Sequence, residues 1–533
     1  MSLLLTLFSA VLLPLSLPNE LLRWGSPLLG VIALVPVFVA LMQNPDRRRA
    51  SRHGALFGAV STAIGSYWLA FFGDFAVWTI GGAVLGYTIY NFILFGYLHT
   101  IVHGGTFRRP GSSLHPIWLA AAWAGYEYLK SVGFLGYPWG LIAYPLAALS
   151  PLAQIAEMTG TWGLSFLAAY INATLAVVLV RQDHPVGASR SAVRHVATAA
   201  LLLVAAGTGG LWAAASVEPR ETRHMLLVQQ NVDSWQPGAF PQALEEAQRL
   251  TLTGRAEARE EEPMDTEGWS ETALRRSYDP ADTFYQQEPA WLPFRLFLDL
   301  IDVPLITGSP MPAGGQDATN SALVILPDGS VTGTYGKQQL VPFAESIPGW
   351  HRPAIQRFFR EVIGLFGTWV PGPDSRPVPL PLRDGRRLMI GLPICFEDAF
   401  GWVPREMVNN GAELLVNLTN NSWSRQDSAQ TQHYVAARLR AIELRTSLVR
   451  GTNSGLSTVV DARGRSRSAL PMFAGASEVL EVPLYPPRWT LYRAWGDWLG
   501  IVLALLAILR AASWGLHPSG HKKTTRGTGG SRP

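Results

Sequence analysis

The sequence contains one cysteine, Cys395, among 533 residues. A single thiol excludes an intramolecular disulfide and a multi-cysteine metal cluster. Charged residues are also scarce at 15%, whereas hydrophobic residues make up 48%. No long Lys/Arg block interleaved with aromatic residues occurs, which argues against nucleic-acid binding. The length and composition are typical of a chain with at least two structural units, one membrane-embedded and one soluble.

Long apolar segments recur through the first 217 residues, and each is close to the length needed to cross a bilayer. They cover residues 3–22, 27–43, 54–73, 77–102, 115–135, 160–181 and 195–215, with an eighth at 495–513. We therefore expect about eight membrane-spanning helices. The predicted division is a multi-pass membrane domain over residues 1–217, a soluble catalytic domain over 218–490, and a final span with a basic tail over 491–533.

Arginine clusters predict the orientation of these spans. They fall in alternate loops, at 43–53, 107–112 and 181–195, and the tail from 521 to 533 is also basic. Because cytoplasmic loops carry an excess of Lys and Arg, both termini are expected in the cytoplasm. The soluble domain then lies on the extracytoplasmic face, tethered at both ends, which suggests a lipid-borne substrate. A cleaved signal peptide is a weaker interpretation, since no basic region follows Met1.

The soluble domain alternates between strand and helix patterns. Short apolar runs typical of strands are followed by segments of helical periodicity, and two Gly-containing turns predict hairpins. The expected strands are 224–232, 304–309, 321–326, 388–395 and 413–419; the expected helices are 240–260 and 430–447, the latter with charged and apolar faces; the hairpin turns lie at Asp328-Gly329 and Gly464. This mixture predicts an α/β layered fold with mixed sheets.

Three segments of this domain concentrate reactive side chains. They are "GWSETALRR" around Glu271, "YGKQQLVPFAESIPGW" with Lys337 and Glu345, and "LPICFED" with Cys395 and Glu397. A cysteine nucleophile needs a base to take its proton and positive charge to stabilise the oxyanion that its attack produces. Each residue also has a non-catalytic interpretation. Cys395 could be an inert residue of the hydrophobic core, and Glu271 could face the solvent. Lys337 could be a surface cation, and Glu345 could cap a turn.

Together these segments resemble the nitrilase (C–N hydrolase) superfamily, which has a Glu-Lys-Cys triad in this chain order and an αββα sandwich. Placed between about seven spans and a final one, they resemble the apolipoprotein N-acyltransferase family of bacterial envelopes. Further matching segments are "NLTNNSW" (417–423), "ARLRAIELRTSLVRGTNSGLS" (437–457), "GYPWG" (136–140) and "TWGLSFLAAYIN" (161–172).

The resemblance implies a role for each matching residue. Cys395 would be the nucleophile, Glu271 the general base and Lys337 the cation on the oxyanion side. The supporting carboxylates would be Glu345 and Glu397, and the residues that line the acyl pocket or its entrance would be Phe396, Trp423 and Trp139.

The sequence departs from the family pattern before Glu271. The family has an apolar strand and then W-P-E, whereas this chain reads "EEEPMDTEGWSETAL", with Ser270 in place of the proline. This departure leaves Glu267 and Glu262 as alternative bases. Smaller departures are Ala344 in "VPFAE", where the family has glycine, and Asn421 in "NNSW", where it has aspartate.

The resemblance further implies transfer of an acyl chain from a membrane phospholipid, typically phosphatidylethanolamine, through a Cys395 thioester. The acceptor would be the N-terminal amine of an S-diacylglyceryl-cysteine on a lipoprotein. We expect a monomer in the bacterial plasma (inner) membrane, with no metal and no organic cofactor. Two alternatives stay open: a membrane-anchored amidase that uses water, and a non-enzymatic scaffold. The aromatic and basic segment 348–372 is either an interfacial arm in the lipid headgroups or an amphipathic helix packed on the core.

Overall fold

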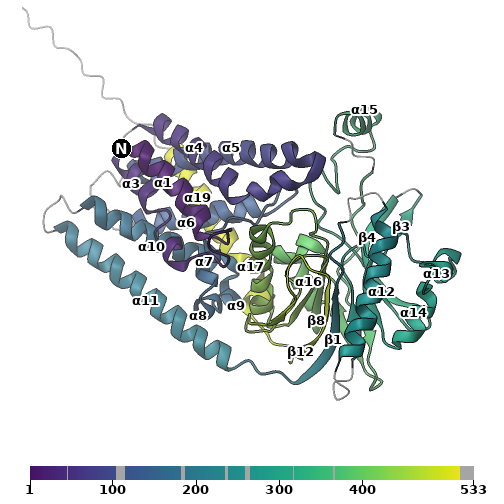
Figure 1. Cartoon of the computed structure of the whole chain (residues 1–533). Coiled ribbons are helices and arrows are strands. Elements are labelled where there is room, and N and C mark those ends of the chain that lie inside the picture. The colour runs from purple at the N-terminus through teal and green to yellow at the C-terminus, as the bar shows by residue number, and fades with distance from the viewer. Residues whose placement is uncertain are drawn as a thin grey trace, which may run out of the picture.

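The computed structural model describes residues 1–44, 46–103, 115–181, 187–233, 238–258, 264–315, 317–363 and 367–515. Figure 1 shows a helical part, formed by the chain before β1 together with the last helix, lying beside an α/β part. The Arg108–Arg109 cluster and the basic tail lie outside the described residues.

The helical part gathers helices from both ends of the sequence, because α19 returns from the C-terminal side to pack on α6. Its helices are α1 (Ser2–Ser16), α2 (Pro27–Gly30), α3 (Val35–Gln43), α4 (Arg47–Gly65), α5 (Ala76–His103), α6 (His115–Ser131), α7 (Ala143–Ala147), α8 (Ser150–Ala153), α9 (Ala156–Thr159), α10 (Thr161–Arg181), α11 (Gly187–Ala215) and α19 (Trp498–Gly515).

Three helices among the described residues are long and apolar enough to cross a membrane, at Ala76–His103, Thr161–Val180 and Ala192–Ala215. Shorter apolar helices occur at Ser2–Ser16, Pro27–Gln43 and Trp498–Ala511. The predicted count of about eight spans is therefore not confirmed. The segment 43–53 is also not the predicted loop, since α4 begins at Arg47 after Asp46, whose side chain accepts a hydrogen bond from the Arg48 N–H and caps the helix.

Polar side chains satisfy the backbone where the helices break between α2 and α3. Asn172 of α10 donates to the Gly30 carbonyl and accepts from the Leu34 N–H, at 2.9 and 2.8 Å. Irregular backbone in an apolar helical domain requires such internal partners.

Close packing of α4 on α5 depends on glycine, because a Cβ at Gly54 would lie 2.3 Å from the Asn91 carbonyl oxygen.

The α/β part is a sandwich of two six-stranded sheets. The first has the order β12-β1-β2-β3-β4-β5 and the second β11-β10-β9-β8-β7-β6. The strands are β1 (Glu221–Gln229), β2 (Thr266–Gly268), β3 (Leu305–Gly314), β4 (Asp317–Ile325), β5 (Val331–Gly336), β6 (Val378–Pro381), β7 (Arg387–Gly391), β8 (Leu414–Thr419), β9 (Leu448–Thr452), β10 (Thr458–Val460), β11 (Ser466–Ala469) and β12 (Ala476–Leu484).

Helices cover the outer faces of this sandwich. Helix α12 contacts β1 and β12 of the first sheet, whereas α16 and α17 contact β7 and β9 of the second. The helices of this part are α12 (Ala239–Glu257), α13 (Thr283–Gln287), α14 (Phe294–Ile301), α15 (Pro353–Phe358), α16 (Trp402–Asn409), α17 (Asp427–Leu444) and α18 (Leu491–Trp495). The expected mixed α/β sandwich is thus confirmed.

The strands that enter and leave the sandwich are neighbours. β1 and β12 pair antiparallel from Glu221 opposite Leu484 to Gln229 opposite Ala476. One predicted strand is shorter than expected: in the run 388–395, β7 ends at Gly391, Ile394 forms an isolated parallel bridge with Leu418, and Cys395 begins a 3₁₀ helix (Cys395–Ala399). Pro393 lies between them and has no N–H to continue a ladder.

Helix α17 joins the two parts of the molecule. The sequence predicts charged and apolar faces for this helix, but residues on all sides of α17 are buried. Gln432 accepts a hydrogen bond from the Trp68 indole at 3.2 Å and donates to the Pro18 carbonyl at 2.9 Å, both in the helical part. Arg440 donates to Glu443 at 2.8 Å and to Thr161 of α10 at 3.1 Å. Both faces of α17 are covered because the helical part packs on the side that the sandwich leaves free.

Candidate active site

Glu271 lies three residues after the end of β2 and is buried in the sandwich, with its side chain 6% exposed. Its Oε1 accepts from Asn320 Nδ2 at 2.8 Å and lies 3.4 Å from Lys337 Nζ, and its Oε2 accepts from the Asn420 N–H at 2.7 Å. The solvent-facing alternative for Glu271 is therefore wrong. The acidic segment before it does not displace it, because Trp269 is fully buried and fixes the end of the strand in the core.

Lys337 comes directly after β5 and is fully buried, so it is not a surface cation. Its ammonium group lies 2.8 Å from Glu345 Oε1 and 5.3 Å from the centre of the Phe396 ring. Burial alone lowers the pKa of Lys337, but the carboxylates of Glu345 and Glu271 outweigh it and raise the pKa above its ordinary value. The amine therefore stays charged at neutral pH.

Glu345 belongs to the loop after Lys337 and has two sets of partners. Its Oε2 accepts from the Val341 N–H at 2.8 Å, which is the turn-capping contact that the sequence also allows. Its Oε1 faces Lys337 and accepts from Asn320 Nδ2 at 3.3 Å. Asn320 of β4 thus bridges the two carboxylates that flank the lysine.

Cys395 is partly buried at the first position of its 3₁₀ helix, with φ at 54°. This left-handed backbone is costly for a residue with a Cβ and needs support from its surroundings. Asn417 of β8 supplies part of that support, since its Nδ2 donates to the Cys395 carbonyl at 2.8 Å. Burial, together with the charge of Glu271, raises the pKa of the Cys395 thiol well above its usual value, while Lys337 opposes this. The resting residue is a thiol.

Glu397 is fully buried next to the cysteine, and both of its carboxylate oxygens accept hydrogen bonds from groups that lie close in space. Its Oε1 accepts from the Tyr335 hydroxyl and the N–H groups of Gln338 and Gln339, at 2.9, 2.7 and 2.9 Å. Its Oε2 accepts from the Ile394 N–H at 2.7 Å. Burial raises the pKa of Glu397 to about 7 against the lowering effect of the three backbone hydrogen bonds and of the Lys337 charge. The carboxylate ties the cysteine turn to the lysine loop.

Of the three predicted substrate-binding aromatics, Phe396 contacts this cluster, whereas Trp423 and Trp139 contact the helical part. Phe396 faces the Lys337 ammonium group and packs on Phe400. Trp423 packs against Trp68 of the helical part at a ring-centroid distance of 5.9 Å. Trp139, in the segment between α6 and α7, is 6% exposed and also contacts Trp68, at 6.3 Å. Trp423 and Trp139 therefore lie at a contact between the helical part and the α/β part.

Glu267, one of the two alternative bases, does not reach the site. Glu267 is buried elsewhere, where its Oε1 accepts from Arg255 of α12 at 2.7 Å. Burial raises the pKa of Glu267 to about 7, opposed by Arg255. Glu262 lies outside the described residues. Asn320 and Asn417 were not expected as site residues. Asn320 comes directly before the predicted strand 321–326, and Asn417 lies in the predicted strand 413–419 and begins the matching segment "NLTNNSW".

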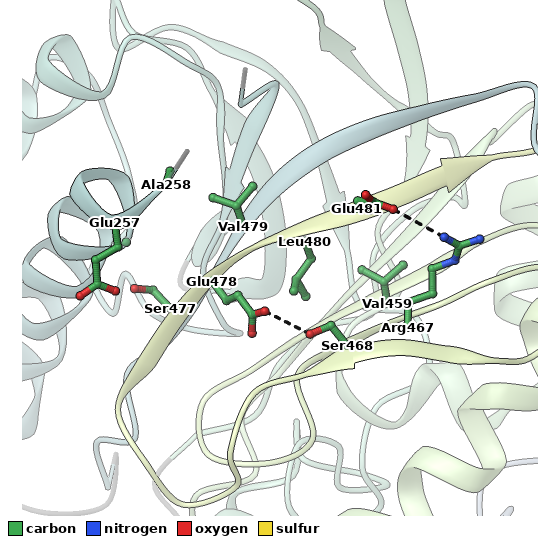
Figure 2. Close-up of a pocket in the computed structure, with 11 residues that line it drawn as sticks. Glu257, Ala258, Val459, Arg467, Ser468, Ser477, Glu478, Val479, Leu480 and Glu481 are labelled. Atoms are coloured by element: carbon green, nitrogen blue, oxygen red, sulfur yellow. Dashed lines mark hydrogen bonds and ion pairs between the residues drawn. The ribbon is translucent and has the colours of Figure 1, made fainter. Parts of the chain in front are cut away.

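One cavity of about 590 Å³ lies elsewhere, between α12 and the edge strands β11 and β12 (Figure 2). Its polar lining pairs internally, with Ser468 donating to Glu478 at 3.2 Å and Arg467 lying 3.6 Å from Glu481. None of the candidate residues lines it. Among the described residues, the clustered Glu271, Lys337, Glu345 and Cys395 are therefore the better candidate for chemistry.

Comparison with known proteins connects both parts of the chain to one family. Residues 9–174 match the domain described as apolipoprotein N-acyltransferase N-terminal domain, and residues 294–479 match carbon-nitrogen hydrolase. The chain is 36% identical to apolipoprotein N-acyltransferase 2 of Treponema pallidum, over 97% of this chain and 95% of that protein. It is 37% identical to apolipoprotein N-acyltransferase 2 of Treponema denticola, over 94% and 95% of the two chains.

Among solved structures, a carbon-nitrogen hydrolase from Helicobacter pylori matches with a TM-score of 0.36 and 17% identity, over 49% of this chain and 89% of that one. The two curated relatives extend over nearly the whole length of this chain and of their own. The chain belongs to the apolipoprotein N-acyltransferase family.

Proposed function

We propose that this protein transfers a fatty acyl chain from a membrane phospholipid to the N-terminal amine of S-diacylglyceryl-cysteine on apolipoproteins. Family membership across both halves of the chain is the observation that carries this conclusion. The buried cluster of Glu271, Lys337 and Glu345 beside the lone cysteine supports it, because acyl transfer through a thioester needs a base, a cation and a thiol.

In the first half-reaction, Cys395 Sγ attacks the ester carbonyl of the phospholipid while Glu271 takes the thiol proton. Lys337 stabilises the negative oxygen of the tetrahedral intermediate. The intermediate then expels the lysophospholipid alkoxide, which receives the proton from Glu271, and the thioester remains. Moving the proton from Cys395 to Glu271 leaves the total charge of the cluster unchanged, which avoids the cost of adding charge to a buried site.

In the second half-reaction, the lipoprotein α-amine attacks the thioester carbonyl and gives up a proton to Glu271. Collapse of the intermediate forms the amide and releases the Cys395 thiolate, which takes that proton back. Water must be excluded, since it would hydrolyse the thioester. The contact of Trp423 with Trp68 and Phe72, at 5.9 and 4.6 Å, supports an apolar wall there, consistent with the proposed lining by Phe396, Trp423 and Trp139.

The proposed topology is eight spans over residues 1–217 and 491–515, with both termini cytoplasmic and residues 218–490 outside the bacterial plasma membrane. Arginines at the start of α4 support this orientation, since cytoplasmic segments carry an excess of Lys and Arg. The first and last strands of the sandwich, β1 and β12, pair with each other, so both ends of the domain lie together, as two tethers to one membrane face require. The donor is a phosphatidylethanolamine-like phospholipid, the acceptor a diacylated prolipoprotein, and the protein acts as a monomer.

The segment 348–372 is proposed to meet the lipid headgroups. Helix α15 has no buried residue and projects away from the sandwich in Figure 1, which supports this proposal over a helix packed on the core. Phe358 and Val362 are 46% and 55% exposed beside Arg357 and Arg360. Exposed apolar side chains interleaved with arginines fit an interface between lipid headgroups and acyl chains.

The test supplies phospholipid with a labelled acyl chain to the purified enzyme in detergent and looks for a thioester on Cys395. A diacylated lipopeptide is then added, and its N-acylation is measured against Cys395→Ala. We expect labelled enzyme first and labelled peptide second, with neither in the variant. Water-dependent release of a small amide product would instead support an amidase, and intact transfer by Cys395→Ala would refute the catalytic assignment.

A further inference from the structure

A second buried charge cluster lies under the cysteine turn, and the reaction scheme above does not use it. Asp398, three residues after Cys395 in the same 3₁₀ helix, is fully buried. Its Oδ1 lies 2.6 Å from Nε2 of His433 on α17, and its Oδ2 lies 3.5 Å from Nε of Arg450 on β9. Because a carboxylate accepts, His433 Nε2 carries the proton and donates it.

This contact bears on the backbone of the nucleophile. The five-residue 3₁₀ helix is too short to fix itself, and its first residue, Cys395, has a left-handed backbone. Asn417 and Glu397 hold the start and the middle of the turn. Asp398 holds its far end, and among the described residues His433 is the hydrogen-bond partner that the structure gives this carboxylate.

His433 also touches the helical part of the protein. Its ring centre lies 5.7 Å from that of Trp139, and the Trp139 carbonyl accepts a hydrogen bond from Lys130 of α6. Trp139 in turn contacts Trp68, which packs on Trp423 at the proposed acyl pocket. His433 is therefore placed between the aromatic contact that faces the acyl chain and the turn that carries the thiol.

We propose that His433 is a positioning residue, which acts through Asp398 to hold the Cys395 turn in its reactive geometry and links that turn to Trp139 of the helical part. The effect on acyl transfer rests on the proposed function, whereas the effect on the reactivity of the thiol does not. A displacement of about 1 Å at a reacting atom can slow a reaction by about 100-fold, so a change at His433 acts on the rate of acylation rather than on donor binding.

Two amide substitutions distinguish a positioning role of His433 from the effect of its side-chain volume alone. In His433→Gln the amide nitrogen lies the same number of bonds from Cβ as Nε2 does, so it can reach Asp398. In His433→Asn it lies one bond short. Both variants keep a small polar side chain in the same buried place. His224→Gln on β1, away from the site, serves as the control for a histidine-to-amide change.

The measurements are the single-turnover rate of Cys395 acylation, the KM for the phospholipid, and the rate of thiol alkylation by iodoacetamide. We expect His433→Asn to lower the acylation rate about tenfold or more with less than about a threefold change in KM, while His433→Gln stays within about threefold of wild type. Alkylation is expected to change in the same order. Equal rates in the two variants, or a change in KM alone, would overturn the proposal.

The alkylation readout keeps the two hypotheses apart. If the wild-type enzyme transferred no acyl chain, the proposed function would fail, but the difference in alkylation between His433→Gln and His433→Asn would still test the positioning role. Thermal unfolding of both variants in detergent shows whether they are folded, and equal alkylation in folded proteins refutes positioning regardless of the substrate.

Discussion

Replacing Lys337 with methionine tests the electrostatic balance of the site most directly. The ammonium group lies 2.8 Å from Glu345 and 3.4 Å from Glu271 and is fully buried. With all three groups charged, the cluster carries one net negative charge, and Lys337→Met would leave two carboxylates with no cation between them. Breaking a buried ion pair in this way costs about 3–5 kcal/mol of stability.

The same substitution removes the group proposed to stabilise the oxyanion, which should lower the acylation rate by about 10²–10³-fold. A double variant separates the two effects. Lys337→Met combined with Glu345→Gln restores the single negative charge, so it should recover much of the lost stability without recovering activity. Arg376→Met provides a matched loss of an exposed cation, since that side chain is 81% exposed and its pair with Asp374 contributes little.

The assay is thermal unfolding in detergent together with the single-turnover rate of thioester formation. Wild-type stability in Lys337→Met would refute the buried-pair reasoning. A double variant less stable than the single one would refute the charge balance, and an unchanged rate in Lys337→Met would refute the oxyanion role.

Three further predictions concern the same site. Glu397→Gln should lower the unfolding temperature, since one carboxylate oxygen becomes an NH₂ that cannot accept from the Ile394 N–H. Leaving that buried donor without an acceptor costs about 1–3 kcal/mol of stability. An unchanged unfolding temperature would contradict the observed hydrogen bond. Burial and the neighbouring carboxylates raise the pKa of Cys395 above 9.0. The rate of iodoacetamide labelling should therefore rise with pH through pH 9, and Glu345→Gln should raise that rate at fixed pH. A labelling rate that reaches its plateau below about pH 8 would refute this. Asn320→Leu removes the amide between the two carboxylates and should lower both stability and the acylation rate, measured by the same two assays; wild-type values would mean that the bridge is dispensable.

Much of the sandwich could be predicted from sequence because its strands carry strong local signals. The apolar runs that became β1, β3, β4 and β8 are bounded by turn residues. Lys337 comes directly after β5, and Glu271 lies three residues after β2. The clustering of these residues followed from the family motifs rather than from periodicity. Motif order predicted which residues meet, although their roles remain to be tested.

The features that could not be predicted from the sequence depend on contacts between residues far apart in the chain. Asn320 gives no periodic signal, and its importance appears only when β4 places it between Glu271 and Glu345. The sequence predicts a charged and an apolar face for α17, but nothing local shows that Trp68 and Pro18 will cover its polar residues. Long-range packing overrides local amphipathicity there.

The pairing of β1 with β12 has a consequence for biosynthesis. β1 is made first and β12 last, so one edge of β1 stays unpaired while the ribosome completes the whole intervening segment. An open strand edge is prone to pair with other chains, and the emerging segment is exposed to this until its own last strand arrives. Because α18 and α19 follow β12 closely in the chain, closure of the sheet and synthesis of the last helix become nearly simultaneous events. A chain truncated before Ala476 should therefore reach the membrane but aggregate there.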